Sequence, residues 1–138
     1  MNIMDETRTE KNPKLTPFSV EFNRDEDLAI FKLYGDLEVN GAQSLRNKFA
    51  SNVLDKDRFL VFDASEMPYL NSTGIGAFLA FLKHAQDRDG KLIILNAHNK
   101  VKNIFKIASL DQYILFLESL DDARNVVAGE NPDTDQED

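Results

Sequence analysis

Ser72 and Thr73 place two hydroxyl groups at the predicted start of an apolar helix, directly before Gly74. A hydroxyl in this position can cap the helix, because its oxygen accepts a hydrogen bond from an unpaired backbone N–H of the first turn. It can also accept a phosphoryl group, since Gly74 and Gly76 remove bulk from the turn and let another molecule approach. The residues alone leave both interpretations open.

The surroundings of Ser72 lack the other parts of an enzyme active site. A nucleophilic serine needs a histidine base, and His84 lies about three helical turns further along the same predicted helix. Gly74 and Gly76 have no third glycine and no following lysine, which excludes a dinucleotide fingerprint or a P-loop. The chain has no cysteine, so thiol chemistry and most zinc sites are excluded too. We therefore expect no enzyme activity, no metal and no cofactor.

Length and charge restrict the class of partner. A chain of 138 residues forms one domain, and its net charge of -8 includes five acidic residues after Gly129. The remaining part is mildly acidic, so nucleic acid is not expected as a partner. No apolar run reaches the roughly 18 to 20 residues that span a bilayer, and the first residues do not read as a secretory signal. We expect a cytoplasmic protein without membrane insertion.

The hydrophobic pattern predicts at least four strands. Alternating apolar residues indicate strands at 18 to 22 and 28 to 34, joined by a turn at 23 to 27 as an antiparallel hairpin. Continuous apolar runs at 59 to 62 and 91 to 96 are typical of strands that are covered on both faces. Functional groups collect beyond the carboxyl ends of such strands, which places the Ser72 loop at that edge of the sheet.

Three further segments have apolar residues three or four positions apart, as in helices that bury one face. Residues 113 to 117 form either an edge strand or the approach to a last helix at about 120 to 127. The alternation predicts an α/β fold, a single domain with a mixed central sheet of about four to five strands and about four helices packed against it. The three helices are expected at residues 40 to 54, capped by Asn40, at 73 to 87, and at about 101 to 108.

The helix after Ser72 is expected to bury one stripe of side chains and to leave Ala77 and Phe81 off that stripe. The domain is expected to span residues 16 to 128, between a flexible N-terminus at 1 to 15 and an acidic disordered tail at 129 to 138. The predicted inward stripe consists of Ile75, Phe78, Leu79, Leu82 and Ala85.

The order of these elements, and two strings within it, resemble the STAS domain family, in particular the anti-sigma-factor antagonists of bacteria. The strings are Asp63-Ala64-Ser65 and the run from Tyr69 to Phe78, which contains Ser-Thr-Gly-Ile-Gly. The likeness extends over roughly residues 18 to 127. Weaker matches are the Gly-Asp-Leu-Glu turn that ends at Glu38, the triplet Gly90-Lys91-Leu92, and Leu110.

The resemblance implies a protein switch. In this family the unmodified antagonist binds an anti-sigma factor that is also a serine kinase of the ATP-binding type, which frees the sigma factor. Phosphorylation by that kinase releases the antagonist, and a serine phosphatase resets it. The matching acceptor in this chain is Ser72, with Thr73 as the alternative. A second implied function is that of a STAS-type binding subunit in a lipid-transport ATPase or a stress-signalling complex.

The residues off the predicted stripe, Ala77 and Phe81, are candidates for the contact surface, together with Met67 and Tyr69 in the preceding loop. Packing against neighbouring helices is at least an equal alternative for these four. The family usually has aspartate where this chain has Asn71 and Glu38. Both positions lie where acceptor and nucleotide would meet, so these departures bear on the identity of the kinase. The expected contact residues are Glu38, Met67, Tyr69, Asn71, Ser72, Thr73, Gly74, Ala77 and Phe81.

Overall fold

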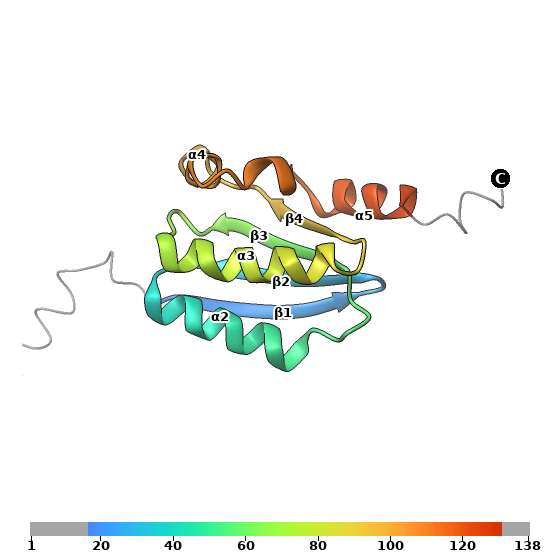
Figure 1. Ribbon diagram of the computed structural model, residues 1–138, viewed down its shortest axis with the longest axis horizontal. Helices are drawn as coiled ribbons and strands as arrows, with labels where there is room; N and C mark the ends of the chain where they lie inside the picture. The colour runs from blue at the N-terminus through green and yellow to red at the C-terminus, as the bar shows by residue number, and fades with distance from the viewer. Residues whose placement is uncertain (1–16, 131–138) are drawn as a thin grey trace, which may run out of the picture.

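A computed structural model describes residues 17–130 of the chain. One five-stranded sheet runs through the molecule, and helices pack against both of its faces (Figure 1). In chain order the elements are β1 (Ser19–Asp25), β2 (Leu28–Tyr34), α2 (Val39–Asn52), β3 (Phe59–Glu66), α3 (Ser72–Gln86), β4 (Lys91–Leu95), α4 (Asn99–Ile107), the 3-10 helix η2 (Asp111–Tyr113), β5 (Leu115–Leu117) and α5 (Leu120–Gly129).

The strands lie in the order β1-β2-β3-β4-β5. The pair β1 and β2 is antiparallel, and every other neighbouring pair is parallel. This arrangement confirms the predicted α/β fold with a mixed sheet and an N-terminal antiparallel pair. It also decides the open question at residues 113 to 117, because β5 is a short edge strand that is followed by the separate helix α5.

The β1–β2 hairpin is tighter than expected. Asp25 pairs with Leu28, so the connection consists only of Glu26 and Asp27, and β1 runs three residues further than the predicted turn allowed. Glu26 adopts a positive φ of 56°, the backbone conformation that a two-residue hairpin loop requires. Asn23, Arg24 and Asp25 therefore belong to the end of β1 rather than to a long turn.

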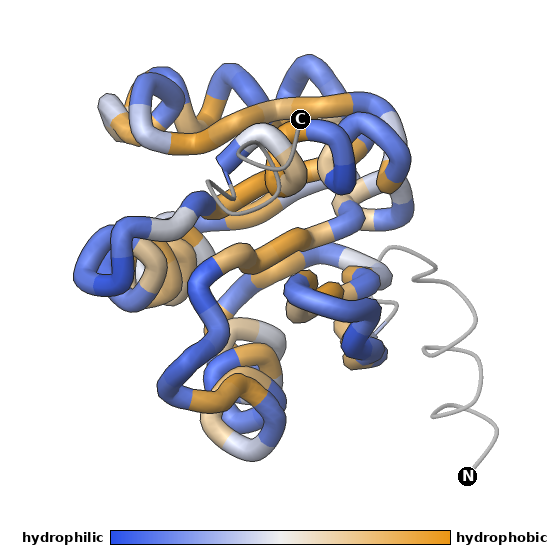
Figure 2. The backbone as a smooth tube through the Cα atoms, turned by 90° about the vertical axis from the view of Figure 1, so that its right-hand side faces the viewer, coloured by the Kyte–Doolittle hydropathy of each residue, from blue (hydrophilic) through white to orange (hydrophobic). Residues whose placement is uncertain are grey.

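Two apolar layers hold the sheet. One contains the inner sides of α2, α3 and α4, and the other lies between the sheet and α5. In Figure 2 the hydrophobic colour runs along the central strands, whereas the helices alternate between the two colours. The aromatic rings of Phe31, Phe62, Phe81 and Phe49 stack in sequence, with centroids 4.3 to 5.4 Å apart along the row. This row ties β2 and β3 to α3 and α2.

The buried stripe of α3 differs from the predicted one. Leu79 was expected inside but is 53% exposed, and Ile75 is only partly buried. Ala77 and Phe81 were expected off the stripe but are 0% and 3% exposed. Two stripes satisfy the helical spacing, and contacts with α2 select the second one, because α3 packs on α2 as well as on the sheet. The buried residues of α3 are Gly74, Ala77, Phe78, Phe81, Leu82 and Ala85.

Helix α2 also begins differently from the prediction. Glu38 rather than Asn40 occupies the N-cap position, and its side chain makes no capping hydrogen bond. At the other end of the domain, Gly129 is the last residue of α5 and Glu130 lies 3.8 Å from Lys91. The predictions for residues 1–15 and for the tail beyond Glu130 fall outside the described residues. Over residues 17–130, no helix has the length and apolar character that crossing a membrane requires.

Candidate functional site

Ser72 is the first residue of α3, at the edge of the sheet where the parallel strands β2, β3 and β4 end. We call this the Ser72 edge; helices α2, α3 and α4 all begin there (Figure 1). The side chain of Ser72 is exposed to solvent, whereas that of the neighbouring Thr73 is half-buried. The two hydroxyl groups that the sequence could not separate therefore differ in accessibility.

Asn71 caps helix α3. Its Oδ1 atom accepts hydrogen bonds from the backbone N–H of Thr73 at 3.0 Å and of Gly74 at 3.1 Å. The prediction that Ser72 or Thr73 fills this role is wrong, because the carboxamide oxygen one residue earlier already reaches both amides. Within residues 17–130, the Ser72 hydroxyl takes part in no hydrogen bond, so it is free for another use.

Replacing Asn71 by alanine is expected to lower the free energy of unfolding by about 1 kcal/mol, because two amides of the first turn lose their acceptor. Ser72→Ala removes a hydroxyl that makes no hydrogen bond and is expected to leave stability unchanged. Urea denaturation of the two variants and the wild type measures the difference. Equal losses for both variants would contradict the capping assignment.

Leu37 clamps the segment before α3. Its N–H donates to the carbonyl oxygen of Tyr69 at 2.9 Å, and its own carbonyl accepts from the N–H of Asn71 at 3.1 Å. A Cβ atom on Gly74 would lie 2.9 Å from that same carbonyl oxygen. The space beside Gly74 is thus filled by Leu37 and not left for another molecule, which corrects the prediction. Only Gly76 leaves room, with Arg46 as its nearest neighbour at 3.6 Å.

Several expected contact residues are parts of the core. Met67 and Ala77 are 0% exposed and Phe81 is 3% exposed, so their side chains cannot form a contact surface in this structure. Phe81 is held there by Phe49, whose ring stacks on it at 4.3 Å. Gly74 is buried as well. Among the other expected contact residues, Glu38 and Ser72 are exposed, and Tyr69, Asn71 and Thr73 are half-buried.

The outer face of α3 offers candidate contact residues that the sequence pattern did not indicate. Ile75 and Leu79 follow Ser72 at three and seven positions, so they lie on the same side of the helix. Leu79 is one of the exposed large hydrophobic residues. Both had been assigned to the core by their spacing. Together with Ser72, these two side chains form a ridge on the outer side of α3. The ridge is polar at Ser72, where the helix begins, and apolar at Ile75 and Leu79.

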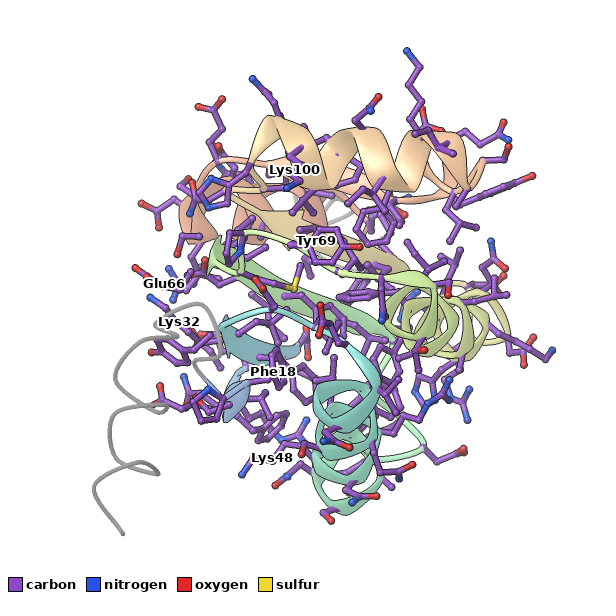
Figure 3. The ribbon with its side chains drawn as sticks, turned by 90° about the vertical axis from the view of Figure 1, so that its left-hand side faces the viewer. Phe18, Lys32, Lys48, Glu66, Tyr69 and Lys100 are labelled. Atoms are coloured by element: carbon purple, nitrogen blue, oxygen red, sulfur yellow. The ribbon has the colours of Figure 1, made fainter. Side chains whose placement is uncertain are left out.

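Tyr69 and Lys100 extend the Ser72 edge towards α4. The Lys100 ammonium group lies over the Tyr69 ring, 5.1 Å from its centroid. His98, just before α4, places its Nε2 atom 2.9 Å from the carbonyl oxygen of Ser65. Figure 3 looks at this edge and shows Tyr69 and Lys100 beside each other. The loop that carries Ser72 is therefore supported from both α2 and α4.

Within the part of the chain that the structure describes, two ionisable side chains, those of His84 and Asp63, have partners other than the Ser72 hydroxyl. The Nε2 atom of His84 lies 2.8 Å from the carbonyl oxygen of Asp57, on the connection between α2 and β3. Asp63 is bound locally, since its carboxylate accepts from the N–H of Ser65 at 3.0 Å and lies 3.6 Å from Lys32. Between residues 17 and 130, no group of three or more histidine, aspartate or glutamate residues could hold a metal ion. The site can present a hydroxyl and a surface to another protein.

A model of the STAS domain matches residues 19–123 of the chain. An anti-sigma-B factor antagonist of Staphylococcus aureus (strain NCTC 8325) is 28% identical over 79 residues, which are 57% of this chain and 73% of the relative. An anti-sigma-B factor antagonist of Listeria monocytogenes is 23% identical over 91 residues, 66% of this chain and 80% of that protein.

Among solved structures, the unphosphorylated form of the anti-sigma factor antagonist SpoIIAA of Bacillus superimposes with a TM-score of 0.70 and 17% identity. The superposition covers 80% of this chain and 97% of SpoIIAA. At this level of identity, the likeness establishes the fold.

Proposed function

Because this chain belongs to the STAS domain family, we propose that it is an anti-sigma-factor antagonist, a cytoplasmic binding protein controlled by phosphorylation of Ser72. In the unmodified state it binds an anti-sigma factor that is also a serine kinase of the ATP-binding type and so frees the sigma factor. Phosphorylation ends this complex, and a serine phosphatase restores it. The printed names of the Staphylococcus and Listeria relatives support the antagonist role.

One observation carries the choice of Ser72. Its side chain is exposed and makes no hydrogen bond with any of residues 17–130, because Asn71 supplies the cap of α3 in its place. Thr73 is half-buried, and its backbone N–H is bound by the Asn71 side chain. A kinase must bring the acceptor oxygen in line with the γ-phosphate, which requires an accessible hydroxyl. Accessibility therefore favours Ser72 over Thr73.

The added phosphate acts on the interface rather than on the fold. It adds about -1.5 to -2 charges at the N-terminus of α3, where backbone amides and the helix dipole favour negative charge. The first turn of α3 contains no acidic side chain that would repel it. Leu37 also holds Tyr69 and Asn71 by backbone hydrogen bonds that the phosphate does not touch. Phosphorylated and unmodified chains should therefore share one architecture.

The contact surface is revised accordingly. It consists of exposed or half-buried residues at the Ser72 edge and along the outer ridge of α3. Leu79 supplies exposed apolar area, and Glu38 lies at the start of the neighbouring helix α2. A surface that surrounds Ser72 in this way makes docking sensitive to charge at that residue. Its members are Glu38, Tyr69, Asn71, Ser72, Thr73, Ile75 and Leu79.

A binding subunit of another assembly, such as a lipid-transport ATPase or a stress-signalling complex, is the second candidate. It is favoured by Asn71, because the resemblance to the antagonists implies an aspartate before the acceptor, where this chain has a neutral residue. A neutral residue there changes the electrostatics that a kinase would meet. The same fold and surface would then serve constitutive binding without a phosphoryl switch.

Incubation with ATP and purified anti-sigma-type serine kinases from the same organism separates the two candidates. The expected result is one phosphate on Ser72, located by mass spectrometry of peptides. Ser72→Ala should abolish the modification, and the matched variant Thr73→Val should retain it. Phosphate on another residue would overturn the site. Absence of modification with every such kinase would favour the constitutive binding subunit.

A further inference from the structure

The solvent side of α4 is basic in an otherwise acidic chain. The sequence from Lys91 to Leu110 contains four lysines and no aspartate or glutamate, although the whole chain has a net charge of -8. Three of these lysines belong to α4, and all three are exposed. We call Lys100, Lys102 and Lys106 the α4 basic face.

Ion pairing within the domain does not account for Lys102 and Lys106, although Lys106 lies in the last turn of α4, where the helix dipole favours positive charge. The part of α4 that stabilises the domain is its apolar side, where Val101 and Phe105 are buried. No described residue forms an ion pair with Lys102 or Lys106. Lys100 lies in the first turn of α4, where the helix dipole disfavours positive charge. Exposed cations that have no ion-pair partner among the described residues are available to a partner outside the domain.

The α4 basic face adjoins the Ser72 edge. Lys100 covers the ring of Tyr69 at 5.1 Å, and Tyr69 lies three residues before Ser72. The backbone carbonyl of Ser65, at the end of β3, holds His98 at 2.9 Å in front of α4. A protein that docks on the Ser72 edge would therefore meet α4 as the next element (Figure 3).

We propose that the α4 basic face is a docking site for an acidic segment of a partner protein. Charge complementarity selects this occupant, since the exposed ammonium groups of Lys102 and Lys106, which form no ion pair with a described residue, attract carboxylates that arrive from outside. The site requires no phosphate on Ser72, so it goes beyond the proposed switch. Long-range attraction of this kind accelerates association and weakens as salt is added.

Two other polyanions fit the same face less well. Lipid binding by an amphipathic helix needs a free apolar side, and Val101 and Phe105 are already buried in the domain. Three lysines contribute roughly 1 kcal/mol each at an anionic membrane, which is too little to anchor a chain of net charge -8. Nucleic acid binding depends on many phosphate contacts, which three lysines do not supply.

The probe for the test is a synthetic oligoglutamate peptide, titrated into the isotope-labelled full chain while amide resonances are followed by NMR. Shifts are expected at residues 99 to 107 and should diminish as salt is added. The double variant Lys102→Gln/Lys106→Gln is expected to bind about fivefold more weakly. Lys56→Gln/Lys83→Gln, which loses the same charge elsewhere, should bind like the wild type.

The variants are first compared by thermal unfolding, which confirms that each remains folded. Failure of the wild type to bind the peptide, or equal weakening in both double variants, would overturn the proposal. Parallel titrations with phosphatidylserine vesicles and with a short DNA duplex test the other polyanions. Tighter binding to either one, abolished by Lys102→Gln/Lys106→Gln, would also overturn the acidic-segment assignment. None of these outcomes depends on Ser72, so they leave the phosphorylation test independent.

Discussion

Replacing Arg24 by methionine is expected to lower the free energy of unfolding by about 3 to 5 kcal/mol. The Arg24 guanidinium donates to the carboxylate of Asp57 at 2.5 Å and to the carbonyl oxygen of Asn52 at 2.9 Å. Asp57 is only 4% exposed, and its second oxygen accepts from the N–H of Leu54 at 2.7 Å. Loss of the guanidinium would leave a buried carboxylate without its cation.

The matched control is Lys83→Met. Lys83 forms an ion pair with Asp87 at 3.3 Å, but the two side chains are 75% and 55% exposed. Water and salt screen such a pair, so its removal is expected to change stability by less than about 0.5 kcal/mol. Urea denaturation measures both variants. A loss for Arg24→Met as small as that of the control would show that the Asp57 carboxylate does not depend on this cation.

The same pair predicts a pH dependence. Burial by itself raises the pKa of Asp57, but hydrogen bonds from Arg24 and the Leu54 N–H, with the Arg24 charge, outweigh it and lower that pKa below its ordinary value. A carboxylate with a lowered folded pKa contributes stability above its unfolded pKa of about 3.9 and loses it as pH falls through the folded pKa.

In Arg24→Met, burial still raises the pKa of Asp57, but the guanidinium that lowers this pKa in the wild type is absent. The difference in unfolding free energy between wild type and variant should therefore be largest above about pH 5 and should shrink in more acidic solution. Denaturation curves at several pH values test this. A difference that stays constant down to acidic pH would contradict the assignment to Asp57.

Sequence reasoning recovered the elements of this fold because each rests on a local pattern. Strands with a continuous apolar run, such as β3 and β4, can only be central, and the parallel arrangement follows from the helices between them. The hairpin loop at Glu26 could not be predicted from a local sequence pattern. Its left-handed φ shortens the hairpin loop, and no residue type such as glycine marked the turn.

The spacing of apolar residues alone does not determine which side of α3 is buried. Leu79 and Phe81 each fit an apolar stripe, and the choice between the stripes is made by α2, through the stacking of Phe49 on Phe81. That contact joins residues far apart in sequence. The same limit explains why Met67, which lies in a loop, was expected at the surface although it is 0% exposed.

The structure changes the local details of the predicted site around Ser72. The Ser-Thr-Gly motif identified the start of α3, but three neighbouring residues can all cap a helix, and only geometry shows that Asn71 does. Similarly, Gly74 was expected to make room for another molecule, whereas Leu37 from an earlier loop occupies that room. The contact between Leu37 and Gly74 joins segments that are far apart in the sequence, so a local motif does not predict it.

Phosphorylation of Ser72 is expected to weaken binding of the anti-sigma factor by about a hundredfold, equivalent to roughly 3 kcal/mol. The phosphate would be enclosed by the docked partner and would lose its hydration without gaining a paired cation. Ser72→Asp carries one negative charge and should weaken binding by about tenfold. Ser72→Ala should keep full affinity and should not be released when the kinase and ATP are added.

Stability measurements distinguish this interface effect from unfolding. Negative charge at the start of α3 should leave the free energy of unfolding unchanged or raise it by about 0.3 to 1 kcal/mol. Calorimetric titration of each variant with the purified anti-sigma factor gives the affinities. Ser51→Asp is the charge control, because Ser51 is exposed near the end of α2, away from the Ser72 edge.

Three results would contradict the argument. Equal affinities for Ser72→Ala and Ser72→Asp would show that charge at Ser72 does not act on docking. Weakening by Ser51→Asp as large as that by Ser72→Asp would indicate a general charge effect instead of a local one. A loss of stability in Ser72→Asp would mean that the charge disturbs α3 itself. The exposed side chain of Ser72 favours an effect of charge on docking. The Asn71 cap and the backbone hydrogen bonds of Leu37 favour a start of α3 that stays folded when Ser72 carries charge.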